Sequence, residues 1–164
     1  MKHSVAVFFG VGRCPFAPGT AGSLAAALLA LGLHELGGAS LLLMSAAAAT
    51  AFGFWSLDGQ FEDEESDPPW VVVDEVAGQL IALLPVSLWF DLSETAETEH
   101  MIFGWLTGFL LFRILDIWKP WFIGRADKLA GATGIMLDDI LAGATAGTIL
   151  ALIGVSGMML GWIP

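Results

Sequence analysis

Two pairs of adjacent acids follow short apolar runs in this sequence. Asp74 and Glu75 come after Val-Val-Val, and Asp138 and Asp139 come after Ile-Met-Leu. Four carboxylates that met without a partner would repel one another, and a divalent cation would remove that cost. Oxygen ligands with no histidine or cysteine nearby favour Mg²⁺. The pattern predicts a magnesium site formed by all four residues, while the alternative for Asp138 and Asp139 is capping of a helix N-terminus.

The two acid pairs share a glycine at the same distance. The pattern Asp-x-Φ-Ala-Gly, in which Φ is apolar, occurs at residues 74–78 and again at residues 139–143. In a helix, each glycine lies on the same face as the acid four residues before it. The missing side chain leaves room beside the carboxylate for an ion, a phosphate or another helix.

A second cluster mixes both charges in the stretch FRILDIWKPW. Arg113, Asp116 and Lys119 are spaced three apart, so neighbours can touch on a helix. Asp116 could hold both cations or could join the metal site. Pro120 predicts the end of the helix and places Lys119 at that end. A cation beside a carboxylate–Mg²⁺ cluster suits an anionic substrate, while the alternative is an ion-pair ladder that only makes Arg113 tolerable in apolar surroundings.

A third candidate element is the start of an apolar helix after the loop sequence GVGRCPFAPG. Thr20 or Ser23 is expected to begin this helix. Helix N-termini present free N–H groups and a positive dipole to phosphates, and the two hydroxyl groups add donors. Arg13 precedes the helix in the same loop. The alternative role for Thr20 and Ser23 is ordinary N-capping.

The composition predicts a membrane protein. Of 164 residues, 56% are hydrophobic and only 14% are charged, against about 25% charged in typical soluble domains. The mean hydropathy is +0.76. Six Lys and Arg face seventeen Asp and Glu, a net charge of −11 that argues against nucleic-acid binding. Cys14 is the only cysteine, which excludes a disulfide scaffold.

Uncharged runs predict four or five membrane-spanning helices. A helix rises about 1.5 Å per residue, so about 20 residues cross a hydrocarbon core of about 30 Å. The weakest candidate has 15 residues and reaches only about 22 Å as a helix. We therefore expect an all-α, polytopic membrane protein with a single domain over residues 1–164. The candidate spans are residues 20–34, 36–57, 70–90, 101–118 and 140–164.

Five spans give a definite topology. One side receives residues 1–19, 58–69 and 113–139, and the other receives residues 35–39, 91–100 and the C-terminus. All six Lys and Arg then lie on the first side, which the positive-inside rule makes cytoplasmic. The ionisable residues of the three clusters gather on the same side, so we expect the active site to face the cytoplasm.

The rest of the chain contains two acidic stretches and three pairs of glycines. Residues 58–67 hold six acids and no base, and residues 91–100 hold four acids. Both stretches predict solvated loops. Three pairs of glycines with G-x-x-x-G spacing predict close helix packing in lipid. The pairs are Gly104 and Gly108, Gly143 and Gly147, and Gly157 and Gly161.

Four stretches together resemble the phosphatidylglycerophosphatase A family. They run in order over residues 12–143, most of the chain. Phe122 stands where the family usually has proline, and Ala132 where it usually has glycine, but neither difference removes a polar group. The four stretches are GRCPFAPGTAGS at 12–23, VVDEVAG at 72–78, FRILDIWKPW at 112–121 and GATGIMLDDILAG at 131–143.

The resemblance implies a bacterial inner-membrane enzyme that hydrolyses phosphatidylglycerophosphate to phosphatidylglycerol with Mg²⁺. The residues fit that chemistry, since carboxylate-bound Mg²⁺ would activate water and screen phosphate oxygens. The lipid would enter laterally from the inner leaflet. Water or a carboxylate could be the nucleophile. Expected metal ligands are Asp74, Glu75, Asp138 and Asp139; expected phosphate-binding residues are Arg113 and Lys119, helped by Arg13, Thr20 and Ser23; and Asp116 is expected to act as general base or to hold Lys119.

Two alternatives from other classes remain at the level of sequence. A cation transporter or channel would also use acids in its spans, broken helices and close-packed glycines. Transport sites lie near the membrane midplane, whereas these charges gather at one interface. A non-catalytic scaffold that docks a partner through the acidic loop would leave Arg113 and the paired acids without a role.

Overall fold

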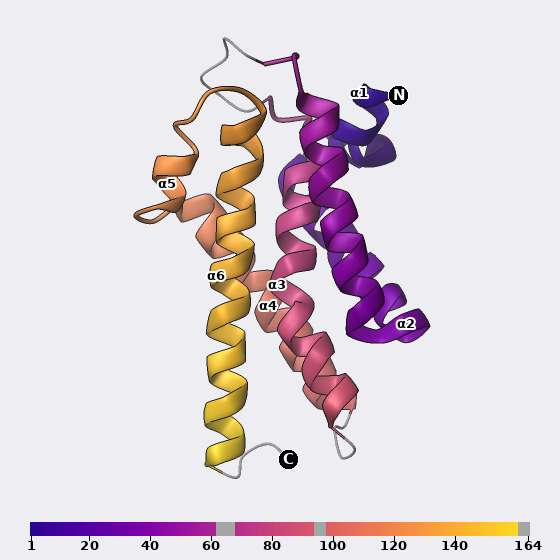
Figure 1. Ribbon diagram of the computed structural model, residues 1–164, viewed down its shortest axis with the longest axis vertical. Coiled ribbons are helices and arrows are strands. Elements are labelled where there is room, and N and C mark those ends of the chain that lie inside the picture. The colour runs from indigo at the N-terminus through magenta and orange to yellow at the C-terminus, as the bar shows by residue number, and fades with distance from the viewer. Residues whose placement is uncertain (62–67, 94–97, 161–164) are drawn as a thin grey trace.

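The computed structural model describes residues 1–61, 68–93 and 98–160. Every regular element in these ranges is a helix (Figure 1). This confirms the expected all-α class. In chain order the elements are α1 (Lys2–Ala6), the 3₁₀ helix η1 (Phe8–Arg13), α2 (Pro18–Leu57), α3 (Val73–Leu92), α4 (Thr98–Trp118), α5 (Ile123–Ala126) and α6 (Gly131–Met159).

The two expected N-terminal spans form one broken helix, α2. Its backbone leaves helical geometry at Gly37 and Gly38, and Gly38 has a φ of 61°, a conformation that glycine adopts without steric cost. Asp91 at the end of α3 accepts a hydrogen bond of 2.7 Å from the backbone N–H of Ala39. The chain reverses at this turn, so the two arms of α2 run in opposite directions (Figure 1). The four long helices therefore make five passes along the bundle.

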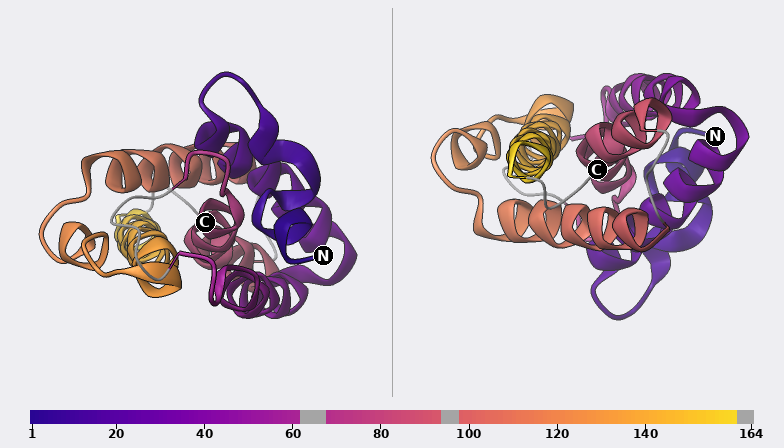
Figure 2. Two further views of the ribbon diagram at one scale, coloured as in Figure 1. Left: turned by 90° about the horizontal axis from the view of Figure 1, so that it is seen from above. Right: turned by 90° about the horizontal axis from the view of Figure 1, so that it is seen from below.

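The middle of the bundle is occupied by α3. Seen along the bundle, it lies between α2 on one side and α4 and α6 on the other (Figure 2). Leu80 and Leu83 of α3 share a buried cluster with Leu42 of α2 and Trp105 of α4. The position of α3 matters for the site because its first turn carries the first pair of acids.

The expected glycine pair of α4 packs against α3. A Cβ atom added to Gly104 would lie 2.8 Å from the Val86 side chain, and one added to Gly108 would lie 2.7 Å from Leu83. Larger residues at these two positions would push the helices apart. The third expected pair cannot be compared with the structure, because Gly161 lies outside the described residues.

Large apolar side chains cover the outside of the bundle. Leu43, Met44, Leu110 and Leu152 are each more than half exposed. The four long helices, counting α2 as one, are each long and apolar enough to cross a membrane. Lipid solvates such a surface without penalty, and the intrahelical hydrogen bonds satisfy the backbone. The chain is thus a multi-pass membrane protein.

Several helix ends differ from the expected spans. The last helix begins at Gly131, nine residues before the uncharged run at 140–164. The expected loop at 91–100 is shorter, since α3 continues to Leu92 and α4 starts at Thr98. An uncharged run marks the part of a helix in lipid, and the helix itself continues into the interface. Of the two acidic loops, residues 62–67 and 94–97 lie outside the described residues.

Candidate active site

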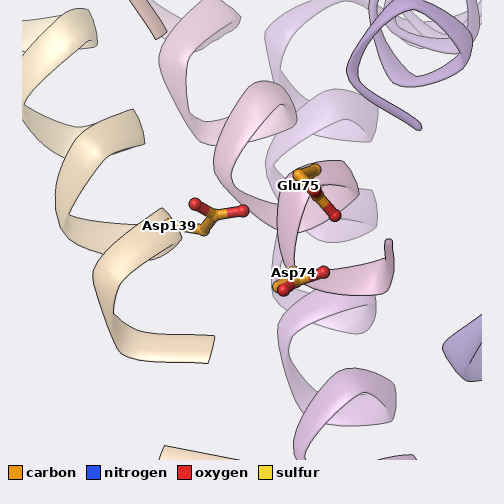
Figure 3. Close-up of side chains that lie close together, drawn as sticks. All are labelled: Asp74, Glu75 and Asp139. Atoms are coloured by element: carbon orange, nitrogen blue, oxygen red, sulfur yellow. The ribbon is translucent and has the colours of Figure 1, made fainter. Parts of the chain in front are cut away.

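Three carboxylates converge between α3 and α6. Asp74 and Glu75 lie in the first turn of α3, and Asp139 projects towards them from the third turn of α6 (Figure 3). One oxygen from each carboxylate lies within 4.8 Å of the other two. Asp74 is 4% exposed and Asp139 is 3% exposed, so the cluster is buried rather than solvated. The structure brings together three of the four expected metal ligands.

A contact between two glycines sets the distance across the cluster. A Cβ atom added to Gly143 would collide with the carbonyl oxygen of Gly78. One added to Gly78 would lie 2.5 Å from the carbonyl oxygen of Asp139. The backbones of α3 and α6 therefore touch one turn inside the acids. Of the three occupants expected beside these carboxylates, the structure shows another helix.

Asp138 lies beside the three-carboxylate cluster but outside it. Its Oδ2 accepts a hydrogen bond of 2.6 Å from the Lys119 ammonium, and its Oδ1 accepts one of 2.9 Å from the N–H of Asp139. Neighbouring residues on a helix point about 100° apart, so Asp138 and Asp139 do not face the same point. The capping alternative is wrong, because α6 begins at Gly131 and both acids lie beyond its first turn.

Arg113 reaches the cluster from α4. Its Nη1 donates hydrogen bonds to Asp116 and, over 3.2 Å, to the hydroxyl of Ser23. A Cβ atom added to Gly19 would collide with Oε1 of Glu75 and lie 3.5 Å from Nη1 of Arg113, so both side chains reach the start of α2. Asp116 holds Arg113, as the spacing of three predicts. Its alternative role of holding Lys119 is wrong.

Lys119 is held by two other acids. It follows the last residue of α4, and its φ of 48° turns the chain towards α5. Its ammonium donates hydrogen bonds to Asp127 and Asp138. Burial lowers the pKa of Lys119, but these two hydrogen bonds outweigh it, and the pKa lies above its ordinary value. Lys119 is thus a permanent cation at neutral pH.

Sequence reasoning did not identify Asp127 as a member of the site. It lies eight residues after Lys119, beyond α5, and no helical spacing relates the two residues. The turn that brings them together depends on left-handed backbone conformations at Lys119 and Trp121. Neither residue type favours that conformation, so the sequence carries no local signal for this turn.

The start of α2 is organised differently from the expectation. The helix begins at Pro18, a residue suited to the first helical position. The hydroxyl of Ser23 donates to the carbonyl of Gly19 over 2.9 Å, so Ser23 does not cap the helix. Thr20, three residues before Ser23 in the same helix, is partly buried. Arg13 is exposed at the end of η1 and forms no hydrogen bond or ion pair with another described residue, so the structure does not join it to the cluster.

The donor set fits a hard divalent cation. The Asp74, Glu75 and Asp139 ligands are all carboxylate oxygens, without histidine or sulfur, which is the chemistry that Mg²⁺ prefers. Asp74 Oδ1 and Glu75 Oε2 are buried and have no hydrogen-bond partner among the described residues. With Asp116, Asp127 and Asp138 included, six carboxylates lie around the two cations Arg113 and Lys119. The formal charges of the site therefore leave an excess of four negative charges, which a divalent cation would reduce.

These features define a polytopic helical membrane protein with a buried carboxylate site at one end of its bundle. The family model described as phosphatidylglycerophosphatase A matches residues 4–154. The chain therefore belongs to the phosphatidylglycerophosphatase A family and is an enzyme of the lipid phosphatase class, as the four stretches of sequence predict. The comparisons give no support to the transporter alternative.

Three relatives support the family assignment. A protein of Escherichia coli named phosphatidylglycerophosphatase A is 36% identical over 160 residues, which cover 93% of this chain and 83% of the relative. A protein of the same name from Haemophilus influenzae is 36% identical over 85% of this chain and 80% of its own. A putative phosphatidylinositol-3-phosphatase of Bacteroides thetaiotaomicron is 35% identical over 82% of each chain. No solved structure matches the chain.

Proposed function

We propose that this protein hydrolyses phosphatidylglycerophosphate to phosphatidylglycerol and inorganic phosphate, with Mg²⁺ as its cofactor. One observation carries the proposal. In a chain of this family, the cluster of Asp74, Glu75 and Asp139 has Arg113 close to it, and Asp138, the neighbour of Asp139, binds Lys119. A metal held by carboxylates together with fixed cations is a suitable arrangement for a phosphate monoester, which carries negative charge on its three free oxygens.

Both cations keep hydrogen-bond donors for a phosphate. A guanidinium has five N–H donors, and among the described residues Arg113 donates only through Nη1. An ammonium has three N–H donors, and Lys119 uses two of them on Asp127 and Asp138. The acids that hold Arg113 and Lys119 therefore orient them without using all their donors. We assign Asp116 the role of positioning Arg113, and Asp138 that of positioning Lys119.

The reaction adds water across one phosphorus–oxygen bond. An oxygen of water forms a bond to phosphorus, the bond from phosphorus to the glycerol oxygen breaks, and the glycerol oxygen leaves with a proton. Asp74, Glu75 and Asp139 would hold Mg²⁺, which supplies positive charge for the transition state and makes the attacking water more acidic. Arg113 and Lys119 bind the phosphate oxygens and compensate the charge that develops on them.

Phosphate release from mixed micelles tests this proposal. The purified protein is assayed on phosphatidylglycerophosphate with Mg²⁺ and with a chelator. We expect release that requires Mg²⁺ and is lost in Asp139→Asn. Asp91→Asn is the matched control, since it removes an acid at the opposite end of α3. Activity that persists in the chelator would overturn the role of the metal.

A second assay tests the choice of lipid substrate. One relative is named for a phosphoinositide substrate, so phosphatidylinositol-3-phosphate is assayed in parallel. We propose the glycerophosphate lipid because two of the three relatives carry its name. A higher kcat/KM for phosphatidylinositol-3-phosphate would contradict this choice of substrate and leave the lipid phosphatase class intact.

We also propose that the site faces the cytoplasm in a bacterial inner membrane. The Lys and Arg residues belong to segments that gather at the end of the bundle with α1 and α5 (Figure 1), and positive charges are retained on the cytoplasmic side. Single cysteines at exposed Lys128 and at exposed Leu36 in a Cys14→Ser background test this orientation. We expect an impermeant thiol reagent to label position 36 from outside intact spheroplasts and position 128 only after lysis. The reverse pattern would overturn the orientation.

A further inference from the structure

One buried polar side chain near the site has no role so far. Gln79 lies in the second turn of α3 and is completely buried. Neither atom of its side-chain amide has a hydrogen-bond partner among the described residues. Burying an unpaired amide costs stability, and such groups usually have a reason to be retained. An apolar side chain of the same size would fill this position at a lower cost.

The helical spacing places Gln79 between the site and the packed glycines of α4. Glu75, Gln79, Leu83 and Val86 follow one another at intervals of four, four and three residues, so they form one stripe on α3. Leu83 and Val86 contact the glycine pair of α4. At the other end of the stripe, Glu75 and Arg113 of α4 both reach Gly19 at the start of α2. Gln79 therefore lies on the face of α3 that is directed at α4, one turn inside Glu75.

The unpaired buried atoms of Glu75 and Arg113 are complementary to the two polar groups of the Gln79 amide. Glu75 Oε2 is a buried acceptor without a partner, and Arg113 Nε is a buried donor without a partner. A glutamine amide offers one N–H₂ donor group and one carbonyl acceptor. Its N–H₂ suits the carboxylate of Glu75, and its carbonyl suits the guanidinium of Arg113. No other uncharged side chain offers both groups with the same reach.

We propose that Gln79 is a positioning residue of the phosphatase site, and this inference rests on the proposed function. Its amide donates to Oε2 of Glu75 and accepts from Nε of Arg113 when the site binds its metal and substrate. The metal ligand and the phosphate-binding guanidinium are then held at a fixed separation. Because the amide is neutral, it does this without altering the charge of a site that is already rich in carboxylates.

The test compares Gln79→Met with Leu83→Met. Methionine has nearly the shape of glutamine without its polar atoms, and Leu83 is an equally buried residue of the same stripe. We expect Gln79→Met to melt at the same or a higher temperature than the wild type in the absence of metal. Its kcat/KM should fall about tenfold to a hundredfold, as when partners of metal ligands are removed. The rise in Tm that Mg²⁺ produces should shrink in Gln79→Met and persist in Leu83→Met.

Two outcomes would overturn the role of Gln79. In the first, Gln79→Met keeps the kcat/KM and the Mg²⁺-induced rise in Tm of the wild type. In the second, its Tm falls while kcat/KM per folded molecule is unchanged, which is the sign of a purely structural residue. Should Gln79→Met fail to fold, Gln79→Glu carries the test, because it keeps the acceptor and replaces the donor. Wild-type kcat/KM in Gln79→Glu would equally overturn the proposal.

The failure of the proposed substrate has a different signature. A wild-type protein that acts on phosphatidylinositol-3-phosphate and not on phosphatidylglycerophosphate would refute the substrate assignment alone. The two variants are then compared on the active lipid. The Mg²⁺-induced rise in Tm needs no substrate, so it reports on Gln79 in either case.

Discussion

The acid pairs of α3 and α6 share a sequence pattern and use their two acids in a corresponding way. Asp74 and Asp139 are the equivalent acids, each four residues before a glycine, and they meet across the contact of Gly78 with Gly143. The remaining acid of each pair lies near a cation. Glu75 and Arg113 both reach Gly19, and Asp138 binds Lys119.

The two pairs differ in how far the second acid points away from the other ligand oxygens. Glu75 has one more methylene than aspartate and stays within 4.8 Å of the other two ligand oxygens. Asp138 is shorter and is directed to Lys119. The shared glycine therefore identifies which acid lies in the helix interface, and the neighbouring cation decides what its partner does. Removing each acid in turn measures how sharply these two roles are separated.

Asp139→Asn is expected to cause the largest loss. It removes one of three carboxylates that would bind Mg²⁺, so kcat/KM should fall by more than about a hundredfold, the upper range for partners outside the metal shell. Asp138→Asn should cost about tenfold, because it only loosens Lys119. Both variants are assayed as purified protein with kcat/KM and the Mg²⁺-induced rise in Tm.

The Mg²⁺-induced rise in Tm distinguishes the roles of Asp138 and Asp139. Asp138→Asn should keep the Mg²⁺-induced rise in Tm, and Asp139→Asn should lose it. Equal losses of activity and of Mg²⁺ protection in both variants would show that Asp138 is a metal ligand after all. Asp91→Asn controls for the general effect of removing an acid.

Gly143→Ala tests the contact that holds the equivalent acids together. The new methyl group would collide with the backbone of α3 at Gly78, and neither backbone can move without separating the acids. Overpacking of this kind costs about 1–3 kcal/mol. We expect a lower Tm in detergent and a lower kcat/KM. Gly154→Ala is the matched control in the same helix, since nothing lies within 4 Å of its added Cβ atom; an equal effect there would contradict the proposed contact.

Lys119→Ala should reduce kcat/KM about tenfold to a hundredfold. A charged hydrogen bond to phosphate is worth about 1.5–3 kcal/mol, and the metal cluster is left in place. Lys119→Arg should restore only part of the activity, because a guanidinium is larger and planar. Asp127→Asn removes one of the acids that hold the ammonium and leaves the phosphate contact. A variant Lys119→Ala with a lower Tm and unchanged kcat/KM would show that Lys119 only stabilises the fold.

The loss of activity in Lys119→Ala should not depend on pH below about pH 10. The pKa of Lys119 is raised in the folded protein by Asp127 and Asp138 despite burial. The ion pairs therefore stabilise the fold fully below the unfolded pKa of about 10.4, and this contribution is lost only as the pH rises through the still higher folded pKa. We expect the ratio of wild-type to Lys119→Ala activity to be constant between about pH 7 and pH 9. A ratio that falls across this range would show that the ammonium deprotonates there.

Much of the fold follows from the order of apolar runs and glycines. The runs predict the passes of the chain, and the glycine pair of α4 predicts its packing on α3. The start of α6 at Gly131 could not be predicted in this way, because its first turns carry Asp138 and Asp139, whose charges interrupt the apolar run. Hydropathy detects lipid contact, whereas the helix extends wherever its polar groups find partners.

The candidate site likewise has contacts that the sequence predicts and contacts that it does not. Spacing along one helix predicts that Asp116 holds Arg113, and pattern predicts that Asp74 and Asp139 lie together. The partner Asp127 and the turning of Asp138 towards Lys119 depend on a left-handed turn after α4. Contacts made through such a turn have no period in the sequence, so only the structure shows them.

Arg13→Gln is expected to have the smallest effect. The sequence places Arg13 with the phosphate-binding residues, but in the structure it is exposed in η1 and contacts none of the acids of the cluster through an ion pair. An exposed cation contributes little through solvent, so kcat/KM should change by less than about fivefold. Arg113→Gln, by contrast, removes a partly buried guanidinium beside Glu75 and should cost more than about tenfold. The comparison is made with both variants on phosphatidylglycerophosphate micelles. A loss in Arg13→Gln as large as that in Arg113→Gln would mean that the N-terminal segment folds onto the site when lipid is bound, and Arg13 would then belong to the phosphate-binding residues.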